Sequence, residues 1–136
     1  MSSGGQSTVK REEFGSDFYW GISASALQTE GAYNADGKGL SIWDEFSKRR
    51  NKILNKDTPN IAADFYSKFE EDIAIINALN IPNFRLSFAW SRILPNGIGA
   101  INPEGLKYYH KVIDCCIANG IEPWVTLYHW DLPQEL

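Results

Sequence analysis

The sequence has no long apolar run, no block of basic residues and only two cysteines among its 136 residues. No stretch approaches the length of a membrane-spanning helix, so we expect no membrane partner. The formal net charge is −4 without any basic cluster, which argues against a nucleic-acid partner. Cys115 and Cys116 are neighbours that would point in different directions on a helix, and with His110 they match no recognised metal-ligand spacing. We therefore expect no disulfide between them and no metal site.

The first thirteen residues lack the apolar segment of a secretory signal. They are mostly small, polar or charged, so residues 1–13 are predicted to be a disordered lead-in and residues 14–136 to form the folded part. The absence of a signal and the two free thiols favour a cytoplasmic setting.

What the chain does contain is typical of a globular protein with one modest core. Hydrophobic residues make up 43% and charged residues 22%. Aromatic residues are frequent at 13%. Sugar-binding pockets use such rings to stack on pyranose faces, but large cores use them as well, so composition does not choose between these two roles.

Hydrophobic periodicity predicts an alternation of strands and helices. Strands are expected at 18–23, 83–90 and 123–128, with amphipathic helices at 60–79 and from Pro103 to just before Asn119. The first helix is predicted to start at Thr58-Pro59. A further one or two helical turns are expected at 41–46 with Ser41 as the cap. Such alternation predicts an α/β fold in which parallel strands are joined by right-handed crossovers.

Polar residues follow two of these strands. His129, Trp130 and Asp131 come directly after the third strand, whose uncharged run predicts burial on both faces. Ligands bind at the carboxyl ends of parallel strands, although a buried aromatic corner would explain the same residues. Gln28 follows the first strand and offers both a donor and an acceptor, as a sugar hydroxyl requires. An ordinary turn with solvated Gln28 and Glu30 is the alternative.

Arg85 is unusual because it interrupts an apolar strand. A buried charge is costly unless it is paired, so Arg85 is expected to face a carboxylate. No carboxylate of this chain is an obvious partner, which points to an acidic residue supplied from elsewhere. The alternative is an edge strand with Arg85 in water.

Several long motifs in the same order resemble glycoside hydrolase family 1, the β-glucosidase-like (β/α)8 barrels. The resemblance runs from about Phe14 to the last residue and covers only the N-terminal portion of that family. Leu27, Phe65 and Asn80 depart from residues frequent in the family. The change at Leu27 concerns local packing more than chemistry, and neither Phe65 nor Asn80 is expected to touch the sugar. The similar segments are 18–32, 36–39, 41–44, 84–87, 90–95 and 127–134.

The resemblance implies an N-terminal part of a TIM barrel, with about three parallel strands and two main helices. It implies that Gln28 and His129 hydrogen-bond the non-reducing sugar and that Trp130 lines the same subsite. It also implies that Arg85 holds the catalytic nucleophile and keeps it ionised. The implied substrate is a small-molecule β-glycoside, and no cofactor or metal is implied because two carboxyl groups suffice. Oligomeric state and sugar preference stay open.

Neither catalytic glutamate of the family is present in this stretch. The resemblance places the acid/base in an Asn-Glu-Pro motif and the nucleophile in a Glu-Asn-Gly motif, and neither occurs here. The parent is expected to be a retaining β-glucosidase acting on short β-glucosides, and the 136 residues alone are expected to be inactive. Two alternatives are a non-catalytic sugar-binding or receptor-like relative and an unrelated α/β protein with aromatic clusters in its core.

Overall fold

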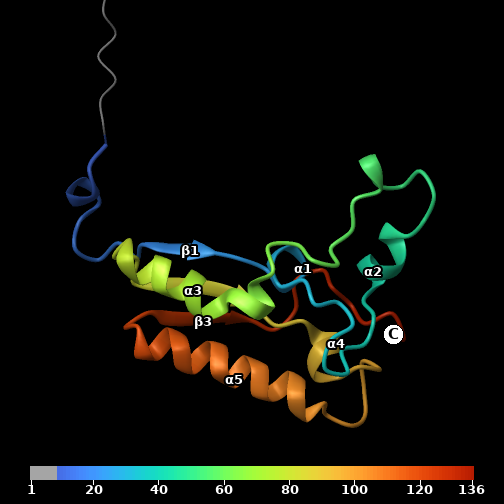
Figure 1. The fold of residues 1–136 in the computed structure, drawn as a ribbon. Helices are drawn as coiled ribbons and strands as arrows, with labels where there is room; N and C mark the ends of the chain where they lie inside the picture. The colour runs from blue at the N-terminus through green and yellow to red at the C-terminus, as the bar shows by residue number, and fades with distance from the viewer. Residues whose placement is uncertain (1–8) are drawn as a thin grey trace, which may run out of the picture.

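The computed structural model of the chain describes residues 9–136 and shows one three-stranded parallel sheet (Figure 1). Its strands are β1 (Gly21–Ser23), β2 (Asn83–Ser87) and β3 (Glu122–Thr126), with β2 in the centre. Both pairs are parallel, which confirms the predicted α/β sheet. Each strand is shorter than predicted, since β1 begins only at Gly21, and β2 and β3 end at Ser87 and Thr126 where the chain leaves the ladder.

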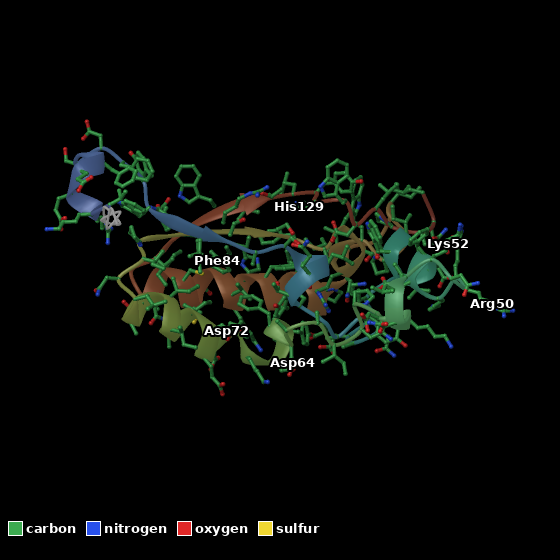
Figure 2. All side chains as sticks on the ribbon, turned by 90° about the horizontal axis from the view of Figure 1, so that it is seen from above. Arg50, Lys52, Asp64, Asp72, Phe84 and His129 are labelled. Carbon is green, nitrogen blue, oxygen red and sulfur yellow. The ribbon has the colours of Figure 1, made fainter. Side chains whose placement is uncertain are left out.

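Two long helices, α3 (Phe65–Ala78) and α5 (Pro103–Ala118), lie on one side of the sheet (Figures 1 and 2). The other helical elements are short. They are α1 (Ala26–Thr29), α2 (Ile42–Ser47), α4 (Trp90–Ile93) and the 3-10 turns η1 (Arg11–Phe14) and η2 (Leu54–Lys56). From residue 9 onward, none of the helices combines the length and the apolar character that a membrane crossing requires.

The core lies between the sheet and these two helices. Phe84 of β2 is buried there and contacts the ring of Phe65 at a centroid distance of 6.0 Å (Figure 2). Ile73 of α3 and Val112 of α5 are completely buried. Burying each such side chain contributes roughly 1.5–3 kcal/mol, so this layer is the main source of stability. The remaining core residues are Phe69, Ile76, Leu86, Tyr108, Tyr109, Cys116 and Ile121.

The opposite face of the sheet is not covered by residues 9–136. Trp124 of β3, which lies beside Arg85 on this face, is 51% exposed. Val125 alternates with Trp124 toward the helix side and is still 41% exposed, because β3 is an edge strand. The prediction that the third strand is buried on both faces is therefore wrong for this chain. An uncharged run was compatible with double burial, but β3 is an edge strand with helices on one side only.

Several helix boundaries and faces also differ from the prediction. Helix α3 begins at Phe65 rather than at Thr58-Pro59, because Asp64 adopts a left-handed backbone (φ 58°) and interrupts the helical path. Residues 90–93 form the short helix α4, so Trp90, which was predicted to end the second strand, begins a helix instead. Leu79, Leu106 and Ile117 are exposed, since α3 and α5 face the sheet through other residues.

The N-terminal prediction is only partly open to comparison. Residues 1–8 of the predicted lead-in lie outside the described residues, and the last residues of that stretch form η1. The Arg11 guanidinium donates to the Asn80 carbonyl (3.4 Å) and lies 5.6 Å from the Trp20 ring. These two contacts attach η1 to residues that precede β1 and β2, although the residues of η1 are exposed.

Candidate functional site

Arg85 occupies the centre of the uncovered sheet face. Its Nε donates to Thr126 Oγ1 of β3 at 3.0 Å, and Nη1 donates to Ser23 Oγ of β1 at 3.4 Å. β2 is the central strand, so the edge-strand alternative is wrong, and Arg85 is exposed because its face has no cover. No carboxylate within residues 9–136 forms an ion pair with Arg85. Its expected acidic partner stays a prediction.

The neighbouring positions of the same face are polar or aromatic. Trp124 of β3 donates through its indole to Asn83 Oδ1 of β2 at 3.2 Å, and Tyr19 contacts the Trp124 ring at 6.1 Å. The sequence analysis did not single out these three residues. The signal was present, since Asn83 and Arg85 alternate with the buried Phe84 and Leu86 as residues of one strand must.

Gln28 lies on α1, the four-residue helix that follows β1. The side chain is exposed, and its Oε1 accepts a hydrogen bond from Ser25 Oγ at 2.9 Å. The amide nitrogen makes no hydrogen bond within the part of the chain that the structure describes. The alternative of an ordinary turn with two solvated side chains is wrong, because the segment is helical and Glu30 is only 3% exposed.

His129 and Trp130 follow β3 at its carboxyl end. His129 is half-buried, lies on the side of the sheet away from the helices and donates its backbone N–H to Asp131 Oδ1 at 3.3 Å (Figure 2). Trp130 is 70% exposed and adopts a left-handed backbone with φ 71°. A non-glycine residue in this region is strained, and such strain is concentrated at functional sites.

The loop that bears His129 is hydrogen-bonded to the long connection between α1 and α3. Ile42 N–H donates to the Leu132 carbonyl and Gln134 N–H to the Leu40 carbonyl, both at 2.8 Å. Ser41 caps α2 in a reciprocal capping box with Asp44, which confirms the predicted cap. Backbone and cap together fix where the chain turns after β3.

In the same region, Lys38 Nζ forms an ion pair with Oδ2 of the buried Asp44 at 3.2 Å. Asp131 is 2% exposed and lines a small cavity of about 20 Å³ together with Asp44, Ser91 and Glu30. Burial raises the pKa of Asp131 above its ordinary value, against the opposing effect of its backbone hydrogen bonds and of Lys38. Desolvation dominates, so Asp131 is a costly charge in this position.

A second ion pair, Glu30 with Arg92, is deeper in the molecule. Arg92 Nε donates to Glu30 Oε2 at 3.0 Å, and the Tyr109 hydroxyl donates to Glu30 Oε1 at 2.7 Å. Burial raises the pKa of Glu30, and Arg92 and Tyr109 act in the opposite direction. Burial is the largest effect on Arg92 and acts to lower its pKa, but the charge of Glu30, the hydrogen bond to Glu30 and the neighbouring tyrosines together raise the pKa above its usual value. No local pattern in the sequence indicates this pair, because its members are 62 positions apart.

Gln28, Arg85, His129 and Trp130 come from the central strand and from the segments that follow β1 and β3. No hydrogen bond joins any two of them among residues 9–136. That range also lacks a cluster of three histidine, cysteine or acidic side chains able to hold a metal ion. The arrangement is that of a (β/α)8 barrel wall with polar and aromatic side chains at the carboxyl ends of its strands.

Comparison with known proteins identifies which barrels this wall resembles. The sequence model of glycosyl hydrolase family 1 matches residues 10–136, and the chain belongs to this family. β-Glucosidase A of Acetivibrio thermocellus is 48% identical over 123 residues, which is 90% of this chain and 28% of that protein. Rat lactase/phlorizin hydrolase is 50% identical over 125 residues, or 91% of this chain and 6% of that protein.

Solved structures show the same relationship. A β-glucosidase from Thermotoga maritima in complex with glucoimidazole superposes with a TM-score of 0.85 at 45% identity, covering 87% of this chain and 27% of that one. A rice β-glucosidase in a covalent complex with Glc gives 0.86 at 47% identity, covering 88% and 25%. These solved structures are family 1 TIM-barrel β-glucosidases, so the chain has the fold of part of such a barrel. It spans about a quarter of the length of most curated relatives that it matches.

Proposed function

We propose that the protein built on this chain is a retaining β-glucosidase that hydrolyses terminal β-D-glucosyl residues of short β-glucosides in the cytoplasm. The chain supplies part of the pocket for the non-reducing glucose. Gln28 and His129 bind its hydroxyls, and Trp130 lines the subsite. Both catalytic glutamates come from chain outside these 136 residues. The two free thiols support the cytoplasmic assignment.

The observation that best supports this function is the exposed guanidinium of Arg85 at the centre of an uncovered, polar sheet face. Hydroxyl groups from both neighbouring strands hold it in place, at 3.0 Å and 3.4 Å, without neutralising its charge. An arginine fork fixed in this way suits a carboxylate that must stay ionised. In a retaining glycosidase that carboxylate is the nucleophile, which lies roughly 5 Å from the acid/base carboxyl group.

The relatives support the glycone assignment. The matched Thermotoga maritima structures hold glucoimidazole and deoxynojirimycin, and the rice structure holds Glc covalently. Such ligands bind in a barrel pocket at the carboxyl ends of the strands, where Gln28, His129 and Trp130 lie in this chain. A hydroxyl group both donates and accepts hydrogen bonds, which the amide and the imidazole can match.

The test is a fused barrel in which residues 9–136 replace the segment that they match in the Thermotoga maritima enzyme. We expect it to hydrolyse 4-nitrophenyl β-D-glucoside with retained anomeric configuration. Gln28→Ala should raise KM by roughly 5- to 150-fold, the loss of about 1–3 kcal/mol expected when sugar hydroxyls lose their partner. A folded fused barrel with no activity, or one in which Gln28→Ala leaves KM unchanged, would contradict the proposal.

The second candidate is a non-catalytic sugar-binding relative, because the polar and aromatic side chains on this sheet face suit sugar binding with or without hydrolysis. It would use the same Gln28 and His129, so pocket variants do not distinguish the two. Sequencing the positions of the Asn-Glu-Pro and Glu-Asn-Gly motifs in the gene does. Replacement of either glutamate would favour the binding protein over the hydrolase.

A further inference from the structure

The ion pair between Glu30 and Arg92 joins three elements that are far apart in the sequence. Glu30 follows α1, Arg92 belongs to α4, and Tyr109, which donates to Glu30, belongs to α5. The Tyr109 hydroxyl also accepts the backbone N–H of Ala89 at 2.6 Å. A single carboxylate therefore fixes the relative positions of all three helices.

Arg92 also holds the backbone that follows Glu30. Its Nη2 donates to the carbonyl oxygens of Gly31 at 3.3 Å and Ala32 at 3.4 Å. The guanidinium lies over the Tyr66 ring, 4.3 Å from its centroid, and is 0% exposed. These contacts are directional and lie on several sides of Arg92. Only one position of residues 30–32 therefore satisfies all of them.

The short helix α1 needs such anchors. A helix of four residues has no independent stability, because nucleation is costly and too few hydrogen bonds repay it. At its start, Ala26 N–H donates to the buried Ser87 Oγ of β2 at 2.8 Å. At its end the chain is fixed by Glu30. Gln28 lies between these two anchors, two residues before Glu30.

We propose that Glu30, Arg92 and Tyr109 are positioning residues that set the place of Gln28 in the sugar subsite without touching the sugar. This inference rests on the proposed function. Replacing a buried ion pair by apolar residues of similar volume is often neutral or stabilising, so stability alone does not account for a charged pair here. The pair instead gives directional bonds to a segment that must present one amide at a fixed point.

The test is a double-mutant cycle in the fused barrel, because such a cycle isolates the coupling between two positions. Tyr109→Phe removes one hydroxyl, and Arg92→Met removes the charge while keeping most of the volume. Each is made with Gln28 present and with Gln28→Ala. The readouts are kcat, KM and the Kd of glucoimidazole measured by calorimetry.

We expect each variant to weaken glucoimidazole binding and raise KM about 3- to 10-fold with Gln28 present, a coupling of ordinary size for residues in one network. With Gln28→Ala, the same variants should change neither value further. Ile73→Ala serves as a control that destabilises the core far from α1 and should leave Kd unchanged. Equal losses in both Gln28 backgrounds would show a general structural role and overturn the inference.

The two proposals fail in different ways. An inactive fused barrel that still binds glucoimidazole contradicts the hydrolase but leaves the cycle measurable through Kd. An active fused barrel with additive effects keeps the hydrolase and overturns the positioning role. If Arg92→Met does not fold, Tyr109→Phe alone decides, since it removes a single oxygen atom and keeps the ring.

Discussion

Gly105 provides the sharpest stability test, because helix propensity and packing predict opposite outcomes there. It lies in the first turn of α5 and is buried against α4. Replacing a helical glycine by alanine ordinarily stabilises a helix by about 1 kcal/mol. At this position, however, the added Cβ would lie 2.0 Å from the Arg92 carbonyl oxygen and 2.8 Å from its carbonyl carbon.

The magnitude follows from that contact. The Cβ atom and the Arg92 carbonyl oxygen must separate by more than 1 Å to reach the 3.4 Å of ordinary contact. The carbonyl belongs to backbone that cannot rotate away. The same oxygen accepts a hydrogen bond from Asn102 Nδ2 at 2.9 Å, which would be disturbed as well. Overpacking costs typically about 1–3 kcal/mol, and the 2.0 Å contact is severe, so after the propensity gain of about 1 kcal/mol we expect Gly105→Ala to be destabilising by up to about 2 kcal/mol.

The assay is urea unfolding of the fused barrel followed by tryptophan fluorescence, with recovery on dilution confirming that the transition is reversible. Ala74→Gly is the matched control, since Ala74 is exposed within α3 and the change should cost only the propensity difference of about 1 kcal/mol. Gly105→Ser should be worse than Gly105→Ala. An unfolding midpoint of Gly105→Ala equal to or above that of the parent would refute the packing argument.

Three further predictions concern charge and protonation. Arg85→Lys keeps the charge but not the fork, so kcat of the fused barrel should fall by about 10- to 100-fold with little change in KM, and an unchanged kcat would contradict this role. Burial and the hydrogen bond to Asp36 raise the pKa of Tyr66 to about 12 from 10.0. The fold keeps that proton where the unfolded chain loses it, so stability should fall between pH 10 and 12, and Tyr66→Phe should lessen the fall in urea midpoint. Asp131→Asn should raise the midpoint at pH 7, because burial raises the pKa of Asp131, and the gain should disappear in acid where Asp131 is protonated.

The sequence was informative where the signal is local. A capping residue and its partner are three positions apart, so Ser41 could be assigned as the cap of α2 from the sequence. Arg85 was conspicuous because one charge interrupted an apolar strand, and the structure places it on the polar face of β2. The alternation of strands and helices likewise predicted a parallel sheet from neighbouring segments.

Features that depend on distant contacts were not accessible. Glu30 and Arg92 are 62 positions apart, and nothing near Glu30 in the sequence indicates that Arg92 and Tyr109 enclose it. The start of α3 depended on the left-handed backbone of Asp64, which propensity does not foresee. The exposure of Trp124 follows from the uncovered face of the sheet and that of Val125 from the edge position of β3, which are properties of the assembled fold rather than of the strand.

The backbone of Trp130 links folding and ligand affinity in opposite directions. Its positive φ is costly for any residue with a Cβ atom, and glycine would adopt the same turn without that penalty. We therefore expect a Trp130→Gly variant to have a higher free energy of unfolding and to lose the ring against which the proposed sugar would lie. Selection for thermal stability alone would favour the loss of this indole. Residue 130 should therefore be kept as tryptophan when such barrels are screened by melting temperature.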